Sequence, residues 1–233
     1  RDNVDDGLHT ESKQHLYASH NFIVMAGQET VGLFFDYPGA IRYDIGFTRQ
    51  DTLTVTCDRA DLALYGITGE GPLDVVRQVR AIIGHSYIPP KFAFGFGQSR
   101  YGYKTRADFE EVVTKHRQAH IPLDMVYMDI DYMDHFKDFT VNPEEFPDFA
   151  GFVAEMKEQG VRLVPIIDAG VKEEKGYPVC DEGKAKGYFC KRADGTDFEA
   201  VVWPGWSHFP VVLNPEARAC FGSQHKALTD CGI

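Results

Sequence analysis

Three aspartates stand close together directly after an apolar run, and this is the place in the sequence where chemistry is easiest to support. The run covers residues 125–128, and Asp129, Asp131 and Asp134 follow it. A short apolar run of this kind is typical of a buried strand, so the carboxylates come where that strand emerges. Because charged side chains are costly to bury for packing alone, we expect a site here.

Two other uses of these acids must be weighed against a substrate site. Asp129 or Asp131 could cap a loop, which is a purely structural role. Asp129, Asp131 and His135 could also serve as ligands of a metal-dependent barrel hydrolase, but their spacing matches no strong metal motif. The sequence therefore predicts no metal ion, and nothing in it indicates another cofactor.

Further polar and aromatic residues follow the other predicted strands. Tyr101 comes after the first of them, Asp168 ends an apolar run at 161–167, and Trp203 lies in a loop before the last predicted helix. In a βα barrel the carboxyl ends of the strands form one face, so these residues would meet Asp129 there. Carboxylates accept hydrogen bonds from sugar hydroxyls, and aromatic rings stack on pyranose C–H groups. The combination favours a sugar site, although packing or turn roles would explain Tyr101, Trp203 and Asp168 as well.

The spacing of apolar residues changes near Pro89 and Pro90, and this separates two sets of elements that could position these residues. Before it, residues 15–67 alternate with period two, which indicates antiparallel β-sheet, and residues 72–83 form an amphipathic helix. After it, strands are predicted at 92–96, 123–130 and 161–167. Helices are predicted at 105–119, from 149 to about 159, and from 215 to about 231.

Alternating strands and helices predict a parallel sheet with right-handed crossovers. We therefore predict an α/β protein with three regions: an antiparallel β part over 1–71, a helical linker over 72–90, and the first three βα units of a barrel over 91–233. An eight-stranded barrel takes about 250 residues, so the barrel is expected to be incomplete in this chain.

Composition narrows the class of partner. The chain has 233 residues, 43% of them hydrophobic. Its formal net charge is −11 and it contains no basic run, which argues against a nucleic-acid partner.

The sequence contains no apolar stretch of about 18 residues, so we expect no membrane span. The five cysteines form no CxxC pair, and residues 1–6 do not resemble a signal peptide, so we expect free thiols and a cytoplasmic protein. The sequence makes no prediction about oligomeric state.

A series of motifs, in order and over almost the whole chain, resembles glycoside hydrolase family 31, the α-glucosidase family, and most of all its bacterial gut-type members. The D-I-D-Y-M and V-W-P-G segments are the most specific. The motifs are L-Y at 16–17, N-F at 21–22, I-P-P-K-F-A-F-G-F at 88–96, Q-S-R-Y-G-Y at 98–103, I-P at 121–122, D-I-D-Y-M-D at 129–134, D-F-T at 138–140, F-P at 146–147, Asp168, V-W-P-G at 202–205, F-P at 209–210 and N-P at 214–215.

The resemblance implies a β-sandwich followed by a (βα)₈ barrel, and retaining hydrolysis of terminal, non-reducing α-glucosyl units from maltose-like or isomaltose-like oligosaccharides. Asp129 would hold the hydroxyl at C4, and Asp168 another hydroxyl of the same sugar. Tyr101 matches a position that shapes preference between α-1,4 and α-1,6 linkages. The other implied substrate-binding residues are Ile130, Ile166 and Trp203, which would line the sugar pocket, and Asp5, on a loop from the β part.

The catalytic carboxylates are a separate matter. Retaining glycosidases need two carboxyl groups about 5–5.5 Å apart. The resemblance places the nucleophile in a W-x-D-M-N-E motif after the fourth strand and the acid/base later still, and this sequence contains no such motif. We therefore predict no catalytic residue within residues 1–233, and no activity from this segment alone.

Three alternatives stay open. The chain could be a non-catalytic carbohydrate-binding or truncated protein, or it could come from an α-xylosidase or another α-glycosidase of the same family.

Val211 and Cys220 stand where the family usually carries Asp and Trp, so the loop after Trp203 and the helix that follows are the parts that depart most from the pattern.

Overall fold

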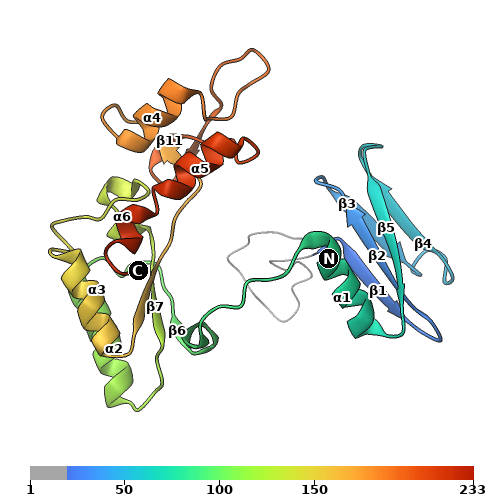
Figure 1. Ribbon diagram of the computed structural model, residues 1–233, viewed down its shortest axis with the longest axis horizontal. Helices are drawn as coiled ribbons and strands as arrows, with labels where there is room; N and C mark the ends of the chain where they lie inside the picture. Colours follow the sequence, from blue (N-terminus) through green and yellow to red (C-terminus); the bar gives the residue numbers. More distant parts are fainter. Residues whose placement is uncertain (1–19) are drawn as a thin grey trace. The chain divides into compact units, whose positions relative to one another are not determined.

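A computed structural model describes residues 20–233 of the protein (Figure 1). The chain divides into two compact units, one ending at Ile88 and the other running from Pro89 to Ile233. Each unit is described separately below. Within residues 20–233, no helix has the length and apolar character needed to cross a bilayer.

The first unit contains two antiparallel sheets and one helix. Strands β1 (Phe22–Ala26), β2 (Thr30–Asp36) and β5 (Ala63–Gly69) form a sheet in the order β1-β2-β5, and β3 (Ile41–Ile45) pairs with β4 (Leu53–Cys57). The predicted antiparallel strands are therefore confirmed. Phe35 of β2 contacts Tyr43 of β3 edge to face, with ring centroids 5.4 Å apart, but a complete β-sandwich stays a prediction.

Helix α1 (Pro72–Ile83) has the predicted bounds. It buries Val75 and Val79 against Ile67 of β5, which forms the small core of this unit. Gly32 of β2 is required at this contact, because a Cβ there would lie 2.4 Å from a methyl carbon of Val75.

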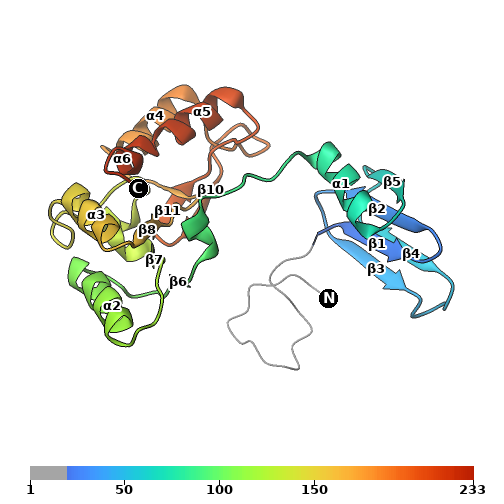
Figure 2. The same cartoon turned by 60° about the horizontal axis from the view of Figure 1, so that its bottom comes forward.

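The second unit is built on a parallel sheet. Strands β6 (Gly97–Gln98), β7 (Met125–Met128) and β8 (Arg162–Pro165) pair in the order β6-β7-β8. Helix α2 (Arg106–Gln118) connects the first two strands and α3 (Phe149–Glu158) the next two. Both helices lie side by side along one face of the sheet (Figures 1 and 2). This arrangement confirms the alternation of strand and helix, and the three strands form an open sheet rather than a closed barrel within residues 89–233.

Aromatic packing joins the two helices to the sheet. Phe109 of α2 and Phe152 of α3 are fully buried, with ring centroids 6.2 Å apart in an edge-to-face contact. Both belong to the main core cluster, which also contains Val126 of β7 and Leu163 of β8. The apolar helix faces that the sequence period predicted are thus the buried ones.

The predicted helix starts are also confirmed. Thr105 and Asp108 form a reciprocal capping box at the start of α2. The side chain of Asn214 accepts hydrogen bonds at the start of α5 (Pro215–Ser223), with Pro215 in the first turn. The predicted end of this helix was wrong, because α5 stops at Ser223 and a separate short helix, α6 (Lys226–Thr229), follows it.

The predicted strand over 92–96 was also wrong. Lys91–Phe94 form a 3₁₀ turn, and pairing with β7 begins only at Gly97. The amides of Ala93 and Gly95 donate to carbonyls three residues back, at 3.0 and 2.9 Å, which uses groups that a strand would offer to its neighbour. The side chain of Phe94 is 73% exposed, so its apolar character does not reflect burial in the sheet.

A small antiparallel sheet follows β8 and was not predicted. It consists of β9 (Val171–Lys172), β10 (Glu199–Val202) and β11 (Gly205–His208), in the order β10-β11-β9, with helix α4 (Pro178–Lys186) between β9 and β10 (Figure 2). Its core is formed by four buried residues, Val171, Tyr177, Cys180 and Phe189. This segment carries Trp203 in the turn between β10 and β11.

Candidate functional site

The pairing of β7 with β8 places Asp129 and Ile166 at the same edge of the sheet. Met128 lies opposite Pro165, and the Ile166 amide donates to the Met128 carbonyl at 2.9 Å. Asp129 and Ile166 therefore leave adjacent strands at their carboxyl ends, where a barrel presents its site. The sequence analysis correctly placed this edge, while the substrate roles of both residues stay predictions.

Asp129 also has the structural role that was considered for it. Its carboxylate accepts a hydrogen bond from the Ile130 amide at 2.7 Å and caps the 3₁₀ turn Ile130–Tyr132. The side chain is nevertheless partly exposed, and a carboxylate has more acceptor positions than one amide can fill. Capping and substrate binding are thus compatible at this residue.

The two isoleucines predicted to line the sugar pocket differ in exposure. Ile166 is 43% exposed and can offer apolar surface to a ligand. Ile130 is only 7% exposed and belongs to the main core cluster, so its packing role is dominant.

Asp168 is held by a buried carboxyl group that the sequence analysis did not single out. Asp138 is fully buried, and its Oδ1 accepts a hydrogen bond from the Asp168 amide at 2.8 Å. The side chain of Asp168 in turn accepts from the Ala169 amide at 2.8 Å and is partly exposed. Asp138 therefore fixes the backbone of a predicted substrate-binding residue from beneath.

The environment of Asp138 is unusual for an aspartate. Its Oδ2 finds no hydrogen-bond partner among residues 20–233. Burial, reinforced by the nearby charge of Asp168, raises the pKa of the Asp138 carboxyl to about 7, although the hydrogen bond from the Asp168 amide acts in the opposite direction. This group consequently changes its charge near neutral pH.

Two buried tyrosines tie the same loop to its neighbours. The hydroxyl of Tyr132 donates to the Ile166 carbonyl, and that of Tyr177 donates to the Asp138 carbonyl, both at 2.8 Å. Burial raises the pKa of both hydroxyls, so they remain donors through the neutral range. The loop after β7 and the end of β8 are thereby fastened together.

The loop after β7 contains strained backbone. His135, Phe136 and Phe139 have φ values of 50°, 60° and 62°, in the left-handed region that residues other than glycine seldom occupy. Lys137 within this loop pairs with Asp134 at 2.9 Å and with Glu174 at 3.1 Å. The third aspartate of the opening motif, Asp134, is therefore used in an ion pair.

Trp203 is well exposed on a hairpin that lies against the Asp168 segment. Its side chain is 70% exposed. Gly170 allows the close approach, because a Cβ there would lie 2.5 Å from Val202 Cγ2, the residue before Trp203. The exposed ring fits the expected stacking platform, whose role no contact in the structure tests.

The two remaining site predictions are less constrained. Tyr101 is 63% exposed in the loop after β6, and in the described part of the chain no hydrogen bond joins it to the other predicted site residues. Asp5 lies outside the described residues. Neither assignment is tested by the geometry.

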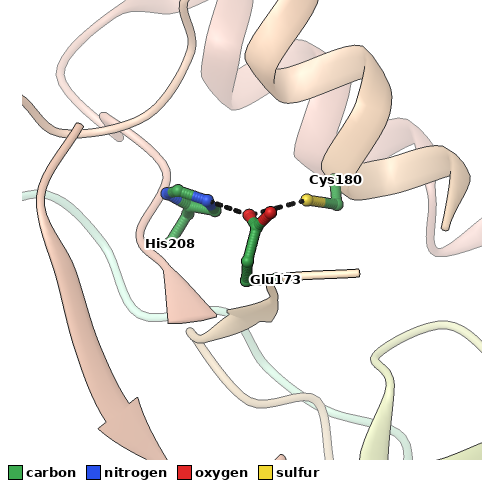
Figure 3. Close-up of side chains that lie close together, drawn as sticks. All are labelled: Glu173, Cys180 and His208. Carbon is green, nitrogen blue, oxygen red and sulfur yellow. Dashed lines mark hydrogen bonds and ion pairs between the residues drawn. The ribbon is translucent and has the colours of Figure 1, made fainter. Parts of the chain in front are cut away.

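The side chains of the alternative metal site, Asp129, Asp131 and His135, do not converge in the structure. The His135 side chain is 78% exposed, and its Nε2 lies 3.6 Å from Asp134. Within residues 20–233, side chains with metal-ligating atoms converge at only one place, where Glu173, Cys180 and His208 meet (Figure 3).

An apolar cavity of about 430 Å³ lies elsewhere in the second unit. Phe92, Tyr127, Val164 and Leu228 are among the residues that line it, and neither Asp129 nor Asp168 does. Its lining is suited to another apolar element rather than to a sugar.

Comparison with known proteins agrees with this geometry. The family described as "Glycosyl hydrolases family 31 TIM-barrel domain" matches residues 86–233. "Alpha-glucosidase 2" of Bacillus thermoamyloliquefaciens is 35% identical over 97% of this chain and 29% of its own length. "Alpha-xylosidase 1" of Arabidopsis thaliana is 35% identical over 79% of this chain and 20% of its own.

The solved structure of a family 31 alpha-glucosidase from Bacteroides thetaiotaomicron is also similar, with a TM-score of 0.84 and 26% identity over 99% of this chain and 39% of that one. The chain spans less than a third of the length of the two relatives named above. The match to the barrel domain covers more than half of the chain, and the alignment with the Bacillus relative covers 97% of it. This chain therefore belongs to glycosyl hydrolase family 31.

Proposed function

We propose that this chain forms the sugar-binding part of a retaining α-glucosidase, which releases terminal non-reducing glucose from α-linked oligosaccharides. The observation that carries the proposal is the position of two partly exposed carboxylates, Asp129 and Asp168, after neighbouring parallel strands of a family 31 barrel. Relatives with identities of 30–42% are named alpha-glucosidases, which supports glucose as the sugar.

In this proposal the charged groups select hydroxyls and the exposed apolar groups hold the ring. Asp129 accepts from the hydroxyl at C4 and Asp168 from another hydroxyl, while Ile166 and Trp203 contact the C–H faces. Ile130 supports the pocket from the core side.

We assign neither catalytic carboxylate to residues 1–233. Asp129 is proposed to bind a sugar hydroxyl, and Asp138, the acid with the raised pKa, is fully buried beneath Asp168. A buried group that supports the backbone cannot reach a glycosidic bond, so the raised pKa of Asp138 does not make it the acid/base.

The test is hydrolysis by the protein expressed from its full reading frame, with p-nitrophenyl α-glucoside and α-xyloside as substrates. We expect kcat/KM to favour the glucoside. The Arabidopsis relative named an alpha-xylosidase makes xyloside cleavage the second candidate, and a clear preference for the xyloside would replace the first. Binding of sugar without any hydrolysis would favour a non-catalytic carbohydrate-binding protein.

Tyr101 provides a prediction about linkage. We expect a preference for maltose over isomaltose, and expect Tyr101→Trp to reduce that ratio of kcat/KM by about 3–10-fold, because one changed ring in a sugar subsite is worth about 1 kcal/mol. Tyr87→Trp makes the same substitution at an 81% exposed residue outside the site and should leave the ratio unchanged. A preference for isomaltose in the wild-type enzyme would refute the linkage assignment.

A further inference from the structure

A cluster of three chemically distinct side chains lies outside the sugar site. Glu173 follows β9, Cys180 is in the first turns of α4, and His208 ends β11. Their ligand atoms all lie within 4.8 Å of one another, and Figure 3 shows His208 and Cys180 on opposite sides of the Glu173 carboxylate, each directed toward it. Three separate segments of the small antiparallel sheet and its helix thus meet at one point.

The contacts of the cluster converge on one oxygen atom. Glu173 Oε2 accepts a hydrogen bond from Nε2 of His208 and lies 3.6 Å from Sγ of Cys180. The other carboxylate oxygen, Oε1, pairs with Lys184. The oxygen that faces the imidazole and the thiol is therefore not the one that the lysine holds.

The cluster is shielded and its geometry is fixed. Cys180 is 1% exposed and His208 is fully buried, while Glu173 remains partly exposed and provides a route from solvent. The ring of Phe189 stacks on that of His208, with centroids 4.7 Å apart and planes 14° from parallel. This stacking holds the imidazole plane in the orientation that directs Nε2 at Glu173.

The charges around the imidazole are unbalanced. Glu199 Oε1 lies 3.6 Å from Nε2 of His208, so the ring faces two carboxylates, while Lys184 is paired with only one of them. The two carboxylates and Lys184 together carry a net charge of −1. A dication bound by a Cys180 thiolate would bring the total for the two carboxylates, the thiolate and Lys184 to zero.

We propose that Glu173, Cys180 and His208 form a binding site for a divalent metal ion of the zinc class, with Glu199 or a water molecule as the fourth ligand. Zinc prefers four ligands of the nitrogen, sulfur and oxygen types, at about 2.0–2.3 Å. Tetrahedral ligands at those distances lie roughly 3.3–3.7 Å apart. The 3.6 Å between Glu173 Oε2 and Cys180 Sγ falls in this range, and the Glu173–His208 contact needs only to lengthen.

Binding must displace protons. Burial raises the pKa of the Cys180 thiol, so the ion has to expel a proton to obtain the thiolate. Apparent affinity is therefore expected to increase as the pH rises, because binding releases the thiol proton.

The second nitrogen of His208 limits the affinity. Its Nδ1 has no hydrogen-bond partner within residues 20–233, whereas histidines that bind metals usually donate from that nitrogen. Loss of such a partner costs about 10–100-fold in affinity, so we expect weaker binding than at a fully supported structural zinc site. The occupied site would tie the hairpin that carries Trp203 to helix α4.

The test is titration of the metal-free protein, expressed from its full reading frame, with Co²⁺ as a spectroscopic probe and Zn²⁺ as competitor. We expect one Co²⁺ per chain, with visible bands of tetrahedral cobalt and a near-ultraviolet thiolate charge-transfer band that zinc abolishes. Cys180→Ser should remove the thiolate band, while Cys57→Ser, in the other unit, should keep it. A wild-type protein without the band, or a band that survives Cys180→Ser, would overturn the proposal.

A second variant covers the case in which Cys180→Ser fails to fold. Glu173→Gln keeps the thiol and the packing but removes the charge, and should weaken cobalt binding at least about tenfold while near-ultraviolet circular dichroism stays native. Unchanged affinity in Glu173→Gln would mean that the cluster is only an ion pair. None of these readouts depends on glycosidase activity, so they are independent of the proposed function.

Discussion

Asp129→Asn is expected to lower kcat/KM for α-glucosides by about 10²–10³-fold, equivalent to roughly 3–4 kcal/mol of transition-state stabilisation. The carboxylate makes charge-assisted hydrogen bonds to a sugar hydroxyl, and an amide oxygen makes weaker ones. The fold should tolerate the change, because the Asn oxygen can still accept from the Ile130 amide that Asp129 now caps. Steady-state kinetics and thermal melting of the full-length protein measure the two effects separately.

A matched control is available in the same loop. Asp134 is five residues further along and pairs with Lys137 at 2.9 Å instead of facing the sheet edge. Asp134→Asn should reduce kcat/KM by less than about fivefold, because the Asp134 side chain is partly exposed and Lys137 keeps its second ion pair, with Glu174. Equal losses in the two variants would show that Asp129 acts through the structure of the loop rather than on the substrate.

Asp138 provides the second large effect, on stability rather than on activity. Its folded-state pKa of about 7 lies well above the value of about 3.9 in an unfolded chain. The folded state therefore keeps a proton that the unfolded state releases between these values. The contribution is fully present below about pH 4 and is lost as the pH rises through about 7.

We expect the difference in unfolding free energy between the wild type and Asp138→Asn to change by about 4 kcal/mol from pH 4 to pH 8, since three pKa units correspond to roughly that energy. The wild type should lose stability relative to the variant as the pH rises. The absolute stability of the variant is less informative, because the Asn NH₂ group would replace an Oδ2 atom that has no partner in the described part of the chain.

Urea unfolding of the wild type and of each variant, at a series of pH values between 4 and 8, measures this effect. Asp230→Asn, which changes an exposed aspartate, should show a difference close to zero at every pH. A pH-independent difference for Asp138→Asn would mean that Asp138 is ionised in the folded protein throughout.

The sequence was sufficient where local chemistry and burial act together. Helix α2 begins where Thr105 and Asp108 indicate a capping box, and it buries Phe109, as the helix period predicts. The edge with Asp129 and Asp168 was predictable because both follow apolar strands of a parallel sheet. The family motifs led to the same arrangement from a separate line of reasoning.

The sequence was not sufficient where tertiary contacts decide. β9 has two residues and β10 and β11 have four each, which is too short for a period to stand out. The Phe92–Phe96 run is apolar, which favours a buried strand. It nevertheless begins with a 3₁₀ turn in which Phe94 is exposed. Asp138 was missed because its complete burial depends on tertiary contacts, and because no local pattern signals the positive φ of its neighbour Phe139.

The most direct test of the central claim is the anomer that is released first when the full-length protein cleaves an α-linked glucoside. Proton NMR at early times distinguishes α-glucose from β-glucose before the two equilibrate. A retaining α-glucosidase releases α-glucose first, and Asp129→Asn should slow this release without changing the anomer. Initial release of β-glucose, or no release of glucose from any α-glucoside, would contradict the function proposed for this family 31 chain.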